Sequence, residues 1–155
     1  MATETFNQKL QDSKDLPKIS ELTDPKAISR YGGTKLLIAP ALAYDEIMKK
    51  IPEGKIVTSD YIRAYLAKVY GADNTCPLTA GIFINIVAKA SEEREEDETP
   101  YWRTLKKDGE LNEKYPGGIA GQRCRLEAEG HTIVQKGKKY FVKDYQDKVY
   151  ALKNA

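Results

Sequence analysis

The sequence predicts a mainly α-helical protein with a small β hairpin near its C-terminal end. Two helical patterns lie close together, at residues 61–69 and 79–90, as in a helix-turn-helix, and two short strand-like segments follow within residues 131–143. The chain has 155 residues, of which 41% are hydrophobic and 31% are charged. A chain of this length can bury a core large enough to fold as one domain without disulfides or a metal.

The composition argues against several classes of function. Cys76 and Cys124 are the only cysteines and His131 is the only histidine, which rules out a disulfide framework and argues against a structural zinc site. No apolar run approaches the roughly 18 residues of a membrane span, and the N-terminus lacks the basic and apolar regions of a signal peptide. We therefore expect a soluble cytoplasmic protein with no cofactor, no metal and no membrane partner.

Residues 1–41 are expected to form an N-terminal extension. Residues 1–33 are polar and interrupted by prolines, which predicts a loosely structured arm with room for one short helix. Residues 35–39 predict a short strand or extended piece. Residues 43–50 show helical spacing that ends before Pro52, because the residue before a proline avoids the helical region.

The centre of the chain carries the two helices of the helix-turn-helix. Thr58 and Ser59 offer N-cap hydroxyls to the first helix, and Gly71 is suited to close it. Residues 71–78 are rich in turn-forming side chains. The second helix is apolar on almost every face, so we expect most of it to be buried against the first.

The last third of the chain predicts loops, one short helix and the hairpin. Glycines make residues 108–121 a looping segment, and residues 122–129 can form a short helix that Gly130 closes. The hairpin follows within residues 131–143. We expect residues 132–155 to be a basic hairpin and tail packed on the rest of the protein.

Charge is unevenly distributed along the chain. Residues 1–98 hold 13 Lys and Arg against 16 Asp and Glu, a net charge of −3, and residues 99–155 hold 12 against 7, a net charge of +5. The basic part can face phosphate or simply be a solvated surface. The acidic run at residues 91–98 is best interpreted as a solvated helix end or loop.

The residues whose side chains could take part in catalysis or bind a metal do not form a recognisable catalytic or metal site. Cys76 lacks a neighbouring histidine and is expected to be a half-buried packing residue. Cys124 lies beside Leu126 and predicts a core contact, and His131 is expected at the surface. The acidic run does not preorganise a metal shell. The glycine-rich residues 117–121 lack the Lys-Ser/Thr pair of a phosphate loop.

A set of residues suited to nucleic acid remains. Hydroxyls at helix starts contact phosphates, and an aromatic side chain beside an arginine can stack on bases. The candidates are Thr58, Ser59, Thr75, Thr79, Trp102, Arg103, Lys106 and Lys107.

The order of these segments resembles the alkylguanine-DNA alkyltransferase family. Residues 51–59 (IPEGKIVTS) are similar to the entry of that family's helix-turn-helix. Residues 99–105 (TPYWRTL), followed by 108–111 (DGEL), are similar to its active-site segment, and 117–130 (GGIAGQRCRLEAEG) to its glycine-rich finish. The resemblance covers residues 42–131. It implies a winged-helix-like helix-turn-helix domain of the alkyltransferase C-terminal type, with double-stranded DNA as partner.

The departures from that family decide the expected function. Tyr101 stands at the position of the alkyl-accepting cysteine and Trp102 at that of the histidine, while Arg103 and Glu129 are kept. A phenol with an ordinary pKa near 10 is a poor alkyl acceptor. Thr79 stands at the position of the arginine that fills the gap left by a flipped base. The non-enzymatic alkyltransferase-like proteins are the most similar branch, although they usually keep the histidine and the arginine.

The sequence therefore predicts a catalytically inactive, alkyltransferase-like DNA-binding protein, linked to the recognition or repair of alkylated DNA. Its partner would be double-stranded DNA, plain or alkylated. We expect Tyr101 and Trp102 to fill the pocket that receives a base in the family, although Tyr101 would contact DNA if the pocket were open. The alternative is a protein-interaction domain that kept the fold and binds a protein partner. An enzyme using Cys76 or Tyr101 is a third, weaker hypothesis.

Overall fold

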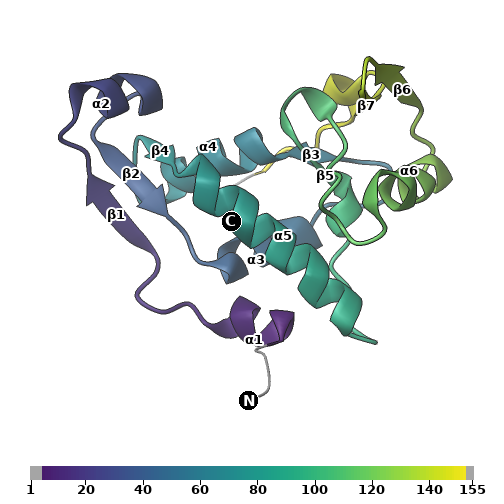
Figure 1. Ribbon diagram of the computed structural model, residues 1–155, viewed down its shortest axis with the longest axis horizontal. Helices are drawn as coiled ribbons and strands as arrows, with labels where there is room; N and C mark the ends of the chain where they lie inside the picture. Colours follow the sequence, from purple (N-terminus) through teal and green to yellow (C-terminus); the bar gives the residue numbers. More distant parts are fainter. Residues whose placement is uncertain (1–4, 153–155) are drawn as a thin grey trace.

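The computed structural model describes residues 5–152. Its longest helix, α5, runs diagonally through the molecule, with the N-terminal elements on one side and the hairpin on the other (Figure 1). In chain order the elements are α1 (Phe6–Gln11), β1 (Lys18–Glu21), α2 (Pro25–Tyr31), β2 (Lys35–Ile38), α3 (Ala41–Lys49), β3 (Val57–Thr58), α4 (Ser59–Tyr70), β4 (Asn74–Thr75), α5 (Pro77–Glu93), β5 (Thr104–Leu105), α6 (Gly118–Ala128), β6 (Ile133–Lys136) and β7 (Lys139–Val142). Three short 3-10 helices lie at η1 (Tyr101–Arg103), η2 (Lys107–Gly109) and η3 (Tyr145–Lys148).

The helix-turn-helix consists of α4 and α5. Gly71 closes α4 in the left-handed conformation, with φ of 72°, as the sequence predicts. The second helix begins two residues earlier than expected, at Pro77, because a proline is well accommodated in the first helical position. It also extends to Glu93, so the first acids of the acidic run belong to the helix.

The N-terminal segment is more ordered than the sequence predicts. The expected arm with one short helix is instead two helices and a strand. Strand β1 pairs antiparallel with β2, and β2 pairs parallel with β4 of the helix-turn-helix. Helix α1 begins with a capping box formed by Thr5 and Gln8, and it packs Leu10, 2% exposed, into the core. The sequence does not reveal this order, because the segment is polar and the strands that pair in it lie far apart along the chain.

The core forms where α3, α4 and α5 meet. Ile62 and Leu66 of α4 and Val87 of α5 are buried in it. Most of α5 is at least partly buried, as expected, but its outer face is not: Leu78 is 73% exposed and Ile82 is 49% exposed.

The C-terminal part carries α6 and the predicted hairpin. Helix α6 begins at Gly118, four residues before the expected start, so part of the predicted loop is helical. Strands β6 and β7 pair antiparallel with Ile133 opposite Val142, which confirms the hairpin. Within residues 5–152 no helix has the length and apolar character needed to cross a membrane.

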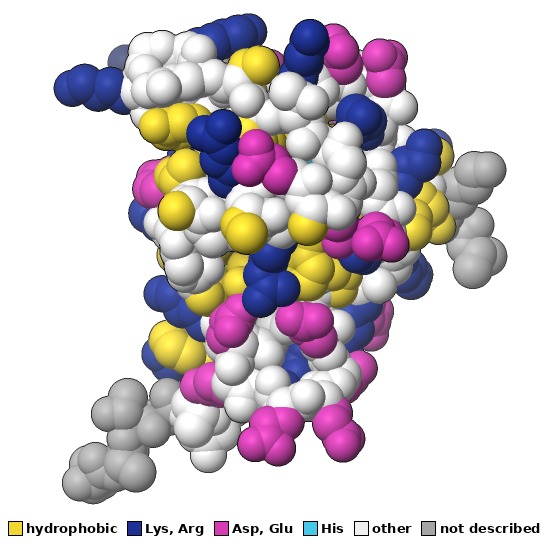
Figure 2. Space-filling model, turned by 90° about the vertical axis from the view of Figure 1, so that its right-hand side faces the viewer, with side chains coloured by type: hydrophobic (Ala, Val, Ile, Leu, Met, Phe, Trp, Pro, Cys, Tyr) yellow, Lys and Arg dark blue, Asp and Glu magenta, His cyan; other side chains and the backbone are white. Residues whose placement is uncertain are grey.

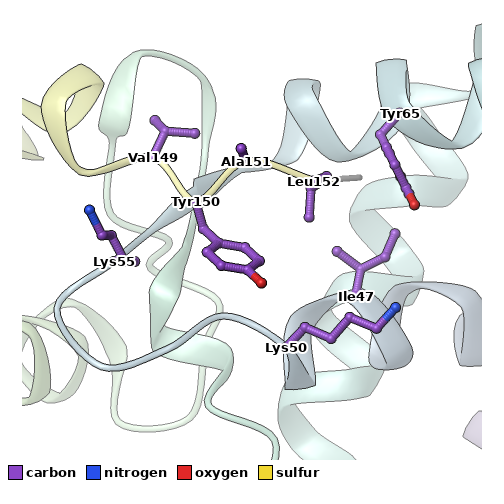
Figure 3. Close-up of a pocket in the computed structure, with 8 residues that line it drawn as sticks. All are labelled: Ile47, Lys50, Lys55, Tyr65, Val149, Tyr150, Ala151 and Leu152. Carbon is purple, nitrogen blue, oxygen red and sulfur yellow. The ribbon is translucent and has the colours of Figure 1, made fainter. Parts of the chain in front are cut away.

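Residues 149–152 pack against the first helix of the helix-turn-helix and the segment that leads into it. The amide of Leu152 donates to the Tyr61 hydroxyl at 2.9 Å, and the amide of Tyr150 donates to the Ile56 carbonyl at 2.8 Å. A cavity of about 380 Å³ lies between this segment, the end of α3 and α4, and the Tyr150 ring points into it (Figure 3). Among residues 5–152, Lys50 and Lys55 are the charged residues that line it.

Candidate nucleic-acid interface

The N-terminal half of α5 presents one face to solvent. Leu78, Gly81, Ile82 and Asn85 lie at helical spacing on this face, and none of them is fully buried. No side chain caps the first turn, where Cys76 is the N-cap residue. The exposed face therefore begins with backbone N–H groups that have no side-chain acceptor and with the positive end of the helix dipole.

Gly81 has open space where a side chain would be. A methyl group there would meet no heavy atom within 4 Å outside its chain neighbours and its own helix backbone. A glycine inside a helix costs about 1 kcal/mol relative to alanine. The packing of this protein does not require that glycine, and its backbone can be approached closely from outside.

A cavity of about 510 Å³ adjoins this face. Helix α5 contributes Gly81, Ile84 and Asn85, and the start of α4 contributes Ser59. The remaining lining residues come from β5 and the loop before α6, with one from β7; they are Thr104, Leu105, Lys106, Lys107, Asp108, Glu110, Asn112, Glu113, Lys114, Tyr115 and Lys139.

The lysines of this cavity differ in their partners. Lys106 lies 3.3 Å from Glu113 and 3.8 Å from Glu110, and Lys139 lies 3.8 Å from Glu110. Lys107 and Lys114 are exposed and have no ion-pair partner among residues 5–152. These two ammonium groups are the ones free to bind an external anion.

Tyr101 and Trp102 are buried and do not line the cavity, although Tyr101 packs against Tyr115, which does. Tyr101 is 2% and Trp102 6% exposed, and their rings meet edge to face with centroids 5.4 Å apart. Tyr115 packs on the other side of Tyr101, at 5.2 Å. Burial raises the pKa of Tyr101 above its ordinary value, and the hydrogen bond from its hydroxyl to Glu92 raises that pKa further. Both rings are therefore buried core residues, as expected if they fill this site.

Glu129 joins Arg103 to Trp102. The indole Nε1 donates to Glu129 Oε2 at 3.1 Å, and Arg103 Nε donates to Oε1 at 2.9 Å. Arg103 also donates to the Ile51 carbonyl at 2.7 Å. Burial alone would raise the pKa of Glu129, but the hydrogen bonds from Arg103 and Trp102 outweigh it and hold that pKa below its ordinary value. The Glu129 carboxylate thus forms an ion pair with Arg103 inside the protein.

Arg125 covers the aromatic pair from the α6 side. Its guanidinium lies 4.3 Å from the Trp102 ring centroid and 5.9 Å from that of Tyr101. The same group lies 3.5 Å from Glu92 and 3.6 Å from Glu98. Acidic side chains gather around the end of α5, in the lower part of the face in Figure 2. This end is about 22 Å along the helix from Leu78, at 1.5 Å per residue.

The structure places the predicted contact residues unevenly. Ser59, Lys106 and Lys107 meet at the cavity. Thr79 is half-buried and its hydroxyl donates to the Cys76 carbonyl at 3.3 Å. The other predicted contact residues are buried or form hydrogen bonds inside the protein; they are Thr58, Thr75, Tyr101, Trp102 and Arg103.

Two further expectations about single residues are wrong. His131 is 4% exposed rather than at the surface, and neither ring nitrogen has a hydrogen-bond partner. It lies where the chain passes from α6 into the hairpin, near the charged groups of Lys148, Glu129 and Arg103. Cys124 is exposed rather than in the core, because it lies on the outer face of α6. Cys76 is half-buried, as expected.

The sequence alone did not single out Leu78, Gly81, Asn85, Lys114 or Lys139. Helical spacing from Leu78 would have grouped the first three on one face. Lys114 and Lys139 carried no local signal, because the fold of the loop and hairpin brings them together.

Comparison with known proteins bears on this architecture. No protein-family model matches the chain, and no curated protein does. Two solved structures from S. pombe match it: Atl1 in complex with damaged DNA containing O6-carboxymethylguanine, with 20% identity and a TM-score of 0.52, and ATL in complex with DNA, with 19% identity and a TM-score of 0.55. Each match covers 72% of this chain and 94% of the other. The protein therefore has the mainly helical fold, with its helix-turn-helix and small hairpin, of the alkyltransferase-like proteins.

Proposed function

We propose that this protein binds double-stranded DNA through the exposed face of α5 and the adjoining lysine-lined cavity, and that it transfers no alkyl group. The observation that carries the proposal is the open helical backbone at Gly81, beside the two unpaired ammonium groups of Lys107 and Lys114. A helix backbone can approach a DNA groove closely only where side chains are small. The S. pombe proteins that share the fold were crystallised with DNA.

Charge supports DNA as the partner of this face. Phosphates are neutralised by lysines that have no internal partner, and Ser59 adds a hydroxyl at the start of α4. The acidic run, which would repel a duplex, lies at the far end of α5. With few free cations the affinity is expected to be moderate and to depend weakly on salt.

The lack of alkyl transfer follows from the state of Tyr101. Its hydroxyl is buried, hydrogen-bonded to Glu92, and its pKa is raised, so the nucleophilic phenolate is scarcely populated near neutral pH. The buried rings of Tyr101 and Trp102 also occupy the space in which a base would have to bind. We therefore expect no discrimination between plain and alkylguanine-containing duplexes, and a link to alkylated DNA would have to act through a partner.

Fluorescence anisotropy with labelled duplexes tests the binding. Plain DNA and DNA carrying O6-methylguanine are compared at two salt concentrations, and the same protein is incubated with DNA carrying a labelled methyl group. We expect similar affinities for both duplexes, weaker binding at higher salt and no label on the protein. Absence of binding to either duplex at low salt refutes the proposal, and stoichiometric labelling refutes the inactive state.

A matched pair of double variants locates the interface. Lys107→Gln with Lys114→Gln should lower the dependence of log K on log salt by about two, if each lysine neutralises one phosphate. Lys50→Gln with Lys55→Gln removes the same charge at the separate cavity of Figure 3 and should leave that slope nearly unchanged. Equal effects of the two pairs would mean that the cavity beside α5 is not the DNA site.

One observation favours the alternative of a protein-interaction domain. The exposed apolar side chains of the helix-turn-helix, Val69, Tyr70, Leu78 and Ile82, are of the kind that protein interfaces bury. This hypothesis predicts that the protein binds a protein partner with an affinity that salt does not weaken, and that it has no affinity for plain DNA. The anisotropy measurement separates the two functions.

A further inference from the structure

The cavity of Figure 3 is lined by two cationic side chains and, among residues 5–152, by no anionic one. Lys50 ends α3 and Lys55 lies in the loop before β3, and both are exposed. Neither lysine forms an ion pair with another described residue. The cavity beside α5 differs, because acidic side chains accompany its lysines. A ligand in the cavity of Figure 3 would therefore meet positive charge that the protein itself does not neutralise.

The rest of this lining is apolar or aromatic. The Tyr150 ring points into the cavity and lies between the two lysines in the view of Figure 3. Ile47 of α3 is buried, and the remaining lining residues are Tyr65, Val149, Ala151 and Leu152. The volume of about 380 Å³ is within the range in which proteins bind small molecules. Such a lining suits a flat, apolar ring that carries a negative charge at one end.

Backbone hydrogen bonds hold the C-terminal wall of this cavity in place. The Ile56 amide donates to the Lys148 carbonyl at 2.9 Å, and the bonds donated by the amides of Tyr150 and Leu152 follow along the same segment. A ligand would not have to order this wall, which lowers the entropic cost of binding. The cavity shares no lining residue with the cavity beside α5. A ligand bound here would thus occupy a site separate from the proposed DNA site.

We propose that this cavity binds a small aromatic carboxylic acid, with its ring against Tyr150 and Ile47 and its carboxylate at the mouth, where the flexible side chains of Lys50 and Lys55 can reach it. Ammonium groups form charge-assisted hydrogen bonds with a carboxylate. The ring adds apolar burial and contact with the tyrosine ring. Recognition requires both parts of the ligand, because a simple anion would contact only the lysines and a neutral ring only the apolar lining.

Titration of the isotope-labelled full protein with 2-naphthoate, followed by nuclear magnetic resonance of the backbone amides, tests this site. Two matched compounds separate the parts of the ligand: 2-naphthamide has the ring without the charge, and acetate has the charge without the ring. The binding free energy available to a ligand of this size corresponds to a dissociation constant of about 1 mM or tighter. Each compound is therefore added up to about 10 mM.

We expect 2-naphthoate to shift the amides of residues 149–152 and to leave those of residues 78–85 unchanged. Lys50→Gln with Lys55→Gln should weaken its binding by between about twofold and thirtyfold, to the level of 2-naphthamide, because two exposed ion pairs are lost. Lys107→Gln with Lys114→Gln removes the same charge from the cavity beside α5 and should leave the affinity for 2-naphthoate unchanged.

A second pair of variants tests the ring contact. Tyr150→Ala should abolish the shifts that 2-naphthoate causes, whereas Tyr150→Phe, which keeps the ring, should retain them. Thermal denaturation shows whether Tyr150→Ala is folded. If it is not, the lysine pair decides the question, because both lysines are exposed and their replacement does not disturb the core.

Four results would overturn the inference. They are the absence of shifts up to about 10 mM 2-naphthoate, equal affinities for 2-naphthoate and 2-naphthamide, equal affinities for 2-naphthoate and acetate, and weakening by the Lys107 and Lys114 pair alone. Displacement of 2-naphthoate by plain duplex DNA would also overturn it, because the cavity would then belong to the DNA surface. A protein that binds 2-naphthoate as expected but no DNA would refute the proposed function and leave this site intact.

Discussion

Replacing Gly81 with alanine should change stability and DNA affinity in opposite directions. An added methyl group would meet no atom within 4 Å outside its own helix and chain neighbours, so the substitution introduces no clash. Alanine is favoured over glycine inside a helix by about 1 kcal/mol, which corresponds to a rise of about 2–4 °C in Tm for a domain of this size. The same methyl group would stand between the α5 backbone and the duplex, and we expect at least a tenfold loss of affinity.

Gly121→Ala provides the matched control for this prediction. Gly121 is also helical, within α6, and a methyl group there would meet the Pro116 carbonyl oxygen at an ordinary 3.5 Å. Its Tm should rise similarly while DNA affinity stays unchanged. Thermal denaturation followed by circular dichroism and anisotropy with plain duplex give both quantities. A Gly81→Ala protein that is more stable and binds DNA as tightly as before would refute close approach at this helix.

The remaining predictions concern the buried groups. Tyr101→Ala should lower the free energy of unfolding by about 3–5 kcal/mol in chemical denaturation without changing DNA affinity, because the ring is a core residue; unchanged stability would mean that the pocket is open. Arg103→Met should cost about 3–5 kcal/mol, since it leaves the largely buried Glu129 carboxylate unpaired, and the added change Glu129→Gln should recover part of that loss; no recovery would argue against the ion pair. Burial, with a further contribution from Lys148, lowers the pKa of His131 in the folded state, so the unfolded chain takes up the proton first and stability should fall as pH drops below about 6.5. The variant His131→Gln should lose that part of the pH dependence in denaturation curves between pH 8 and about 5, and an unaltered dependence would remove His131 as its source.

Features set by neighbouring residues were predictable from the sequence. Helix α4 with Gly71 at its end, strand β2 and the β6–β7 hairpin each follow from spacing or turn residues within a few positions. The burial of Tyr101 and Trp102 agrees with the expectation that these two rings fill the site.

Features set by distant residues were not predictable. Strand β1 exists because it pairs with β2, and no local pattern in a polar segment reveals that partner. His131 was expected at the surface because it begins a basic hairpin, but the folded chain buries it. Lys114 and Lys139 are 25 positions apart, and only the folded loop and hairpin bring them to one cavity.

The anchoring of α1 on the far end of α5 makes the N-terminal segment part of one cooperative unit. The amides of Phe6 and Asn7 donate to the Glu93 carboxylate, and Arg94 donates both to the Asn7 side chain and to the Thr99 hydroxyl, which in turn donates to the buried Asp45. This chain of hydrogen bonds ties α1, α3 and the segment leading to Tyr101 together. The slowest amide protons of α1 and of the centre of α5 should therefore exchange with solvent through the same global opening, rather than α1 fraying independently.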